Sequence, residues 1–171
     1  MSLGITLALM IAAPAHAQST GQPSEAECIP NALMAQVQAK QPLEIDGPTA
    51  TCKARYGWTA EETTAALAVA NATGTVMGDA HRLLAAGVDL DLIDQVMNAM
   101  SEADVAALGT YDQESDAERL AAENNARTVI ANLVSTRVEG DAQITLQMAV
   151  ADRCVARNTI RAFVALRARR H

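Results

Sequence analysis

The chain has 171 residues, half of them hydrophobic but only 2% aromatic, and a formal net charge of −7. Nucleic-acid surfaces need basic and aromatic side chains, so this composition argues against nucleic acid as a partner. The 36 alanines favour helices, whereas strand-favouring residues are sparse. The sequence therefore predicts a single all-α domain, a small helical bundle of about five to six helices.

The first 17 residues have the form of a secretory signal peptide. Residues 3–13 are an apolar run too short to cross a bilayer, and small residues precede the expected cut after Ala17. One feature argues against a signal peptide, because no Lys or Arg precedes this run. The alternative to a cleaved signal peptide is a short buried helix at the N-terminus. We expect cleavage before Gln18, a domain spanning 18–171 without a transmembrane segment, and the periplasm of a Gram-negative bacterium as the compartment.

The first helix of the domain is expected over residues 30–40, where Pro42 follows as a stop. Its predicted buried face carries Leu33, Met34 and Val37. Residues 43–56 are expected to form a loop, because they contain Gly47-Pro48.

Thr59 and Glu62 have the spacing of a capping box, which predicts a long helix ending near Ala86, with Gly87 after it. Gly74 and Gly78 within it are a weak sign of a close helix crossing. The next helices are expected over residues 89–100, 101–109, 115–137 and 142–168. The first of these is predicted to bury Leu92, Ile93, Val96, Met97 and Met100.

A shift of the chain by 53 residues aligns 58–87 with 111–140, with seven identities and Trp58 on Tyr111. This similarity predicts two related helical hairpins plus an N-terminal helix. The alternative is coincidence between two alanine-rich amphipathic helices.

Few residues are suited to catalysis. His16 lies in the expected leader and His171 is terminal, which leaves His81 inside the fold. Catalytic triads and zinc sites need at least one placed histidine and usually several, so no catalytic residue and no cofactor are predicted. One alternative is small-ligand or copper binding by Met77, Met97, Met100 and His81, because Cu(I) prefers soft sulfur ligands. A second is a hydrolytic enzyme with an acid pair that the sequence does not reveal.

The cysteines are the most informative residues. Cys28, Cys52 and Cys154 all follow the expected cut, and no Cys-x-x-Cys motif is present. In an oxidising compartment the simplest arrangement is one disulfide and one free thiol. We predict a Cys28–Cys52 disulfide and a buried, unreactive Cys154, with pairing of Cys154 to either of the others as the alternative.

Charge is distributed unevenly. From Val150 to the end the chain has six arginines and one acid, whereas residues 18–149 are acidic. The C-terminal helix either packs beside acidic helices of its own bundle or binds an acidic partner or membrane surface. We expect Arg153 and Arg157 to face inward. The predicted solvent-exposed interaction residues are Arg167, Arg169 and Arg170.

These features together favour a non-catalytic protein that acts through protein–protein interaction. An accessory subunit, an inhibitor or immunity-type protein and a chaperone-like partner all fit the pattern. The sequence does not identify the protein partner.

Overall fold

The structure, a computed structural model, describes residues 24–89, 91–109, 116–134 and 141–170. Within these ranges it is helical without strands, which confirms the predicted all-α class. One 3₁₀ turn, Glu25–Glu27, precedes the helices α1 (Cys28–Gln38), α2 (Asp46–Tyr56), α3 (Ala60–Ala85), α4 (Asp91–Ala99), α5 (Glu102–Leu108), α6 (Asp116–Val134) and α7 (Asp141–Ala168). The predicted leader and cleavage site lie outside the described residues.

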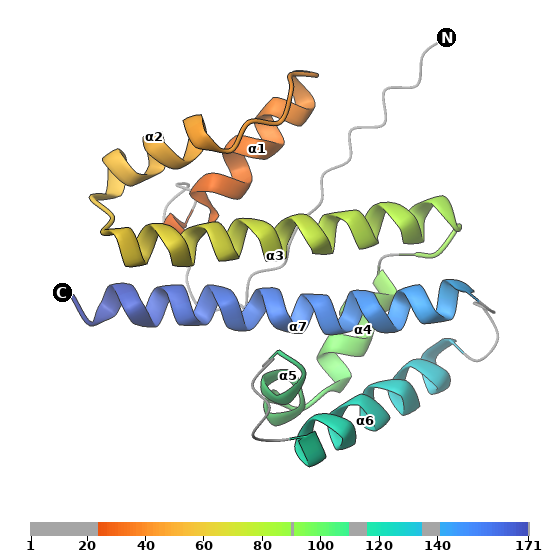
Figure 1. Cartoon of the computed structure of the whole chain (residues 1–171). Coiled ribbons are helices and arrows are strands. Elements are labelled where there is room, and N and C mark those ends of the chain that lie inside the picture. The colour runs from red at the N-terminus through yellow and green to blue at the C-terminus, as the bar shows by residue number, and fades with distance from the viewer. Residues whose placement is uncertain (1–23, 90, 110–115, 135–140, 171) are drawn as a thin grey trace, which may run out of the picture.

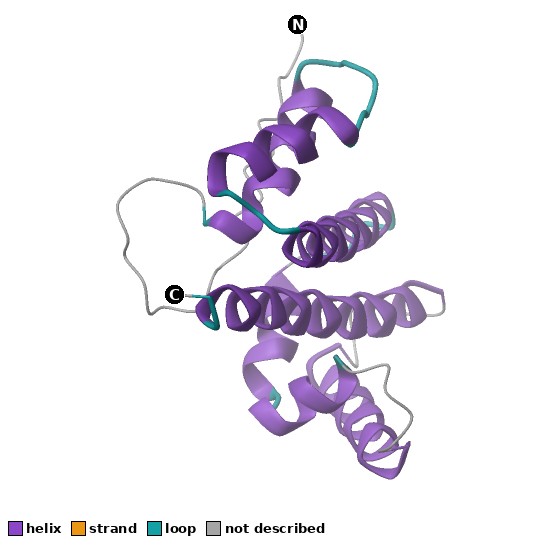
Figure 2. Cartoon of the chain, turned by 60° about the vertical axis from the view of Figure 1, so that its left-hand side comes forward, coloured by secondary structure: helices purple, strands orange, loops and turns teal. Residues whose placement is uncertain are grey.

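Two long antiparallel helices, α3 and α7, form the centre of the molecule (Figure 1). The hairpin of α1 and α2 covers the side of α3 that faces away from α7, and α4, α5 and α6 pack below α7. The turned view shows the same layers, with α3 and α7 side by side between them (Figure 2). None of the helices that the structure describes combines the length and apolarity needed to cross a membrane.

The long central helix begins and ends where the sequence predicts. Thr59 and Glu62 form the expected capping box: the Thr59 N–H donates to Glu62 Oε2 over 2.7 Å, and the Glu62 N–H donates to Thr59 Oγ1 over 3.2 Å. After the helix, Gly87 has a φ of 75°, the left-handed conformation that glycine adopts without steric cost.

The expected loop over residues 43–56 is wrong, because most of it is helix α2. Pro48 is the third residue of that helix, a position whose N–H has no partner inside a helix, so proline does not interrupt it. Pro30 is likewise the third residue of α1, which therefore begins at Cys28 rather than at Pro30. The predicted burial of α1 is also incomplete, since Val37 is 50% exposed.

Two hydrophobic clusters lie at opposite ends of the α3–α7 pair. The disulfide-end cluster consists of Ala26, Ile29, Cys52, Trp58, Ala66, Val69, Ala70 and Phe163. The aliphatic cluster joins α4, α5 and α6 to the other ends of α3 and α7, and its buried members include Leu83, Leu92, Ile93, Val96, Val105, Leu108, Ile130, Leu146 and Val150. The five residues predicted to be buried on 89–100 all belong to this cluster.

The described residues do not support two equivalent hairpins. Each of the aligned segments contains one helix, but α3 packs mainly along α7 rather than along α4, the helix that follows it. The second segment is followed by the 28-residue α7 and the first by the nine-residue α4. Tyr111 and Gly140 lie outside the described residues, so their part of the alignment stays a prediction.

Candidate functional site

The arginines of α7 and the residues after it form a basic stripe: Arg153, Arg157, Arg161, Arg167, Arg169 and Arg170. As expected, Arg153 and Arg157 face acids of their own bundle. Arg153 pairs with Asp94 of α4 at 2.5 Å. Arg157 and Arg161 both reach Glu102 of α5, at 2.8 and 2.7 Å. These contacts hold α7 against α4 and α5, which favours the internal explanation of the basic stripe.

The end of the stripe corrects the prediction that the terminal arginines are free for a partner. The Arg167 side chain is only 13% exposed and pairs with the buried carboxylate of Glu62 at 2.8 Å. Arg170 pairs with the other Glu62 oxygen at 2.7 Å and donates to the Gly57 carbonyl over 3.0 Å. Among the three arginines, only Arg169 is exposed without such a pairing in the described contacts.

Glu62 is the centre of this ion network. The hydrogen bond from the Thr59 backbone lowers the pKa of Glu62 most, and Arg167 and Arg170 lower it further, so that it falls from 4.5 to about 2 despite the opposing effect of burial. Glu62 therefore stays ionised across the physiological range and joins the start of α3 to the end of α7.

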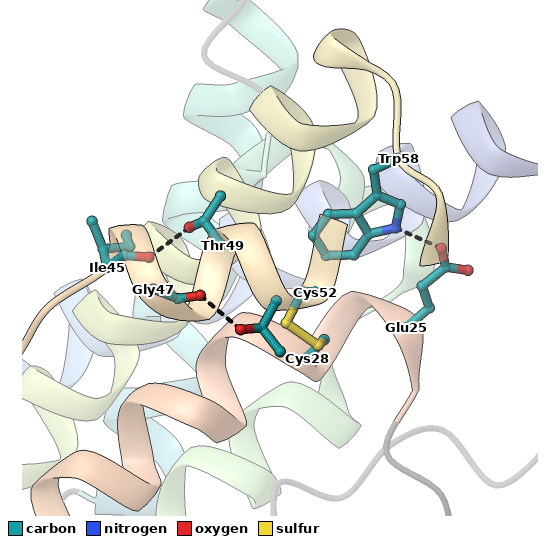
Figure 3. Close-up of a disulfide and its surroundings, with 8 residues drawn as sticks. Glu25, Cys28, Ile45, Gly47, Thr49, Cys52 and Trp58 are labelled. Carbon is teal, nitrogen blue, oxygen red and sulfur yellow. Dashed lines mark hydrogen bonds between the residues drawn. A yellow bond between two sulfur atoms is a disulfide. The ribbon is translucent and has the colours of Figure 1, made fainter. Parts of the chain in front are cut away.

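The cysteines follow the prediction. Cys28 of α1 and Cys52 of α2 form a disulfide with a Cα–Cα separation of 6.0 Å (Figure 3). Close to it, Trp58 Nε1 donates to Glu25 Oε1 over 2.6 Å. Cys154 is a free thiol in the aliphatic cluster, and burial raises its pKa to about 11. A thiol in that environment is nearly all protonated at neutral pH and unreactive.

The candidate copper ligands do not gather in one place. Met97 and Met100 belong to the aliphatic cluster, and Met97 Sδ lies 3.7 Å from Cys154 Sγ. Met77 is half-buried on α3 outside that cluster, and His81 is exposed. No group of three or more His, Cys, Asp or Glu side chains suited to a metal ion occurs in the described parts of the chain.

The structure brings together an acid pair that the sequence did not reveal, Asp79 of α3 and Asp152 of α7. Asp79 is 0% exposed and forms an ion pair with Arg82. A hydrolytic acid must reach its substrate, and a fully buried carboxyl does not. This pair therefore does not favour the enzyme alternative.

A groove lies between the α1–α2 hairpin and α3. Its walls include Leu33 of α1, and Ile45 at the start of α2. Its floor is one face of α3, on which residues recur at four-residue steps: Ala70, Gly74, Gly78 and Arg82. The same hairpin exposes Val37 of α1 and Leu43 of the loop between α1 and α2.

The two glycines of the floor have no role in the internal packing of the described residues. A Cβ added at Gly74 would meet nothing within 4 Å, and one at Gly78 would meet only the end of the Arg82 side chain, at 3.8 Å. Glycine inside a helix costs about 1 kcal/mol relative to alanine. The weak sign of a close helix crossing thus corresponds to a place where the described part of the chain brings no helix against α3.

Arg82 is the one charged residue among those described along this groove. Its side chain is 58% exposed, while its guanidinium pairs with the buried Asp79. The groove therefore ends in an ion pair whose guanidinium is partly exposed. Sequence analysis found the glycines but not Arg82, whose one available signal was its four-residue spacing from Gly78.

No family model matches the chain, and no curated protein or solved structure matches it either.

Proposed function

We propose that this is a non-catalytic, periplasmic binding protein whose groove along α3 receives an amphipathic helix of another protein. The disulfide supports the compartment, because disulfides persist in oxidising environments. The observation that carries the proposal is the pair of helical glycines with open space above them. They lower the stability of α3 and allow a second backbone to approach closely.

The chemistry of the groove indicates what its partner presents. Leu33 and Ile45 offer apolar contact, and Gly74 and Gly78 fit small side chains on the facing helix. The exposed part of the Arg82 guanidinium offers N–H donors at one end, beside its ion pair with Asp79, which favours a partner with a hydrogen-bond acceptor there. We therefore propose a partner helix with small and apolar residues on one face and a hydrogen-bond acceptor near its end.

The first test separates stability from binding. Gly74→Ala should raise the free energy of unfolding by up to about 1 kcal/mol, because alanine favours the helix and fits the open space. Gly74→Leu should fold as well but fill the groove. Ala162→Leu, on an exposed position of α7, is the matched control. Urea unfolding measures the stability of each variant.

The binding test uses a photo-crosslinking residue at Thr75, which lines the groove, and the same residue at Ala162 as a control. In the producing cells we expect a discrete adduct from Thr75 alone. The purified partner should bind the protein at least tenfold more weakly after Gly74→Leu but normally after Ala162→Leu. Equal adducts from both positions, no adduct from Thr75, or unchanged affinity after Gly74→Leu would contradict the proposal.

A further inference from the structure

The contact between α3 and α7 contains two acids at the border of the aliphatic cluster, the fully buried Asp79 and the half-buried Asp152. Asp79 lies on α3 one turn before Leu83, and Asp152 lies on α7 between Val150 and Cys154; Leu83, Val150 and Cys154 belong to that cluster. The buried carboxylate of Asp79 is costly there, because a charge loses its hydration in apolar surroundings.

The hydrogen bonds of Asp79 are incomplete. Its Oδ1 pairs with Arg82 of the same helix, whereas its Oδ2 is buried without any donor. The Asp152 carboxyl lies within hydrogen-bonding reach of Asp79 across the helix contact. Two ionised carboxylates have no proton to place between them, so the orphan oxygen is satisfied only when one of the two acids is protonated.

The charged groups around Asp79 and Asp152 are consistent with one of the two acids being protonated. Burial, together with the hydrogen bond and the negative charge of Asp79, raises the pKa of Asp152 to about 6, and Arg82 opposes the rise. On α7 the adjacent Arg153 is paired with Asp94 of α4, and on α3 the nearby His81 is exposed. The described groove residues that come from the side of the α1–α2 hairpin, Leu33 and Ile45, bring no charge.

We propose that Asp79 and Asp152 form a proton-binding site between α3 and α7, which holds one shared proton in weakly acidic solution and releases it near neutral pH. Bound, the proton gives Asp79 Oδ2 its missing donor and leaves one negative charge for Arg82 to balance. Released, it leaves two carboxylates facing each other in an apolar contact, and the two central helices are held together less firmly. This inference does not depend on the groove having a partner.

The sign of the pH dependence follows from the raised pKa of Asp152. The folded state binds this proton more tightly than the unfolded chain, so its contribution to stability is full in acid and is lost as the pH rises through about 6. Between pH 5 and pH 7.5 the folding equilibrium constant should fall by about tenfold from this site alone.

Urea unfolding at pH 5 and pH 7.5 tests the proposal. The wild-type midpoint should be lower at pH 7.5. Asp152→Asn should remove most of that difference and raise the midpoint at pH 7.5, because its amide donates to Asp79 without a charge. His81→Gln and the exposed Asp46→Asn should keep the wild-type difference, which excludes a histidine or a general charge effect.

Carbon-13 NMR of the aspartate carboxyls measures their protonation directly. A purely structural role of Asp152 would not change the pH at which its carboxyl titrates. Asp152 should titrate with a midpoint near pH 6 in the folded protein. A midpoint below pH 4.5, or a pH difference in stability that survives Asp152→Asn, would overturn the proposal. So would stabilisation by added Ca²⁺ at pH 7.5 that disappears in Asp152→Asn, because it would show a metal ion in place of the proton.

Discussion

The two ends of the α3–α7 pair are closed in different ways. At the disulfide end, Phe163 meets Trp58 edge-on at 5.6 Å between ring centroids, and Tyr56 stacks on Trp58 at 5.8 Å. The Cys28–Cys52 bond lies in the same cluster. At the other end the described cluster contains no aromatic ring or disulfide and consists of aliphatic residues, alanines, methionines and one free thiol.

The comparison shows how a chain poor in aromatic residues builds a core. Around the aliphatic cluster four helices besides α3 contribute side chains, so many small contacts accumulate. At the disulfide end the described elements that cover the long helices are the short α1, α2 and the 3₁₀ turn. There the structure depends on a few large side chains, a covalent bond and the ion network of Glu62.

The largest effect should come from Phe163, a side chain of α7 that lies in the disulfide-end cluster with residues of α3. Phe163 is 1% exposed, and Phe163→Ala should lower the free energy of unfolding by about 3–5 kcal/mol, because a large cavity forms beneath Trp58. Val164→Ala, at a position 54% exposed, should change it little. Urea unfolding measures both. A loss below 1 kcal/mol for Phe163→Ala would mean that the disulfide end does not depend on its rings.

The disulfide should come next. Cys28 and Cys52 are 24 residues apart, and replacing both with alanine should cost about 3.5 kcal/mol on the chain-entropy model. Hydrogen exchange should then speed up in α1 and α2 while α4 and α5 keep their protection, since local stability follows local contacts. Equal acceleration at both ends would break the comparison, because it would show that the two clusters unfold as one unit.

The sequence predicted those parts of the structure that depend on local patterns. The cap at Thr59 and the buried face of α4 both follow from spacing within one helix. Gly47-Pro48 predicts a loop, but Pro48 lies in the first turn of α2, where a helix tolerates proline.

The site residues show why the rest was out of reach. Arg167 contacts Glu62 from 105 residues away, and Asp79 meets Asp152 only because α3 and α7 are antiparallel. Charge counts indicate that such pairs exist but do not say which residues form them. The Cys28–Cys52 pairing was predictable because three cysteines allow few choices and these two are the closest in sequence.

The smallest of the three effects should come from the ion network of Glu62. Because this network depends on a charge, lowering the pH should weaken the disulfide end through it. The lowered pKa of Glu62 means that its contribution to stability is present above pH 4.5 and is lost as the pH falls toward about 2. Glu62→Gln removes the charge but keeps an oxygen for the Thr59 N–H, so it should cost less than either change above. Its stability should also fall less steeply than that of wild type between pH 4.5 and pH 2.

Glu61→Gln is the matched control, because Glu61 is the exposed neighbour in the same first turn of α3. Its acid unfolding should follow that of wild type. Exchange protection at the C-terminal end of α7 should be lost in acid before protection in α4, since Arg167 and Arg170 lose their common carboxylate when Glu62 is protonated. If Glu62→Gln and Glu61→Gln have the same acid profile, then the rings and the disulfide close this end without help from the charges.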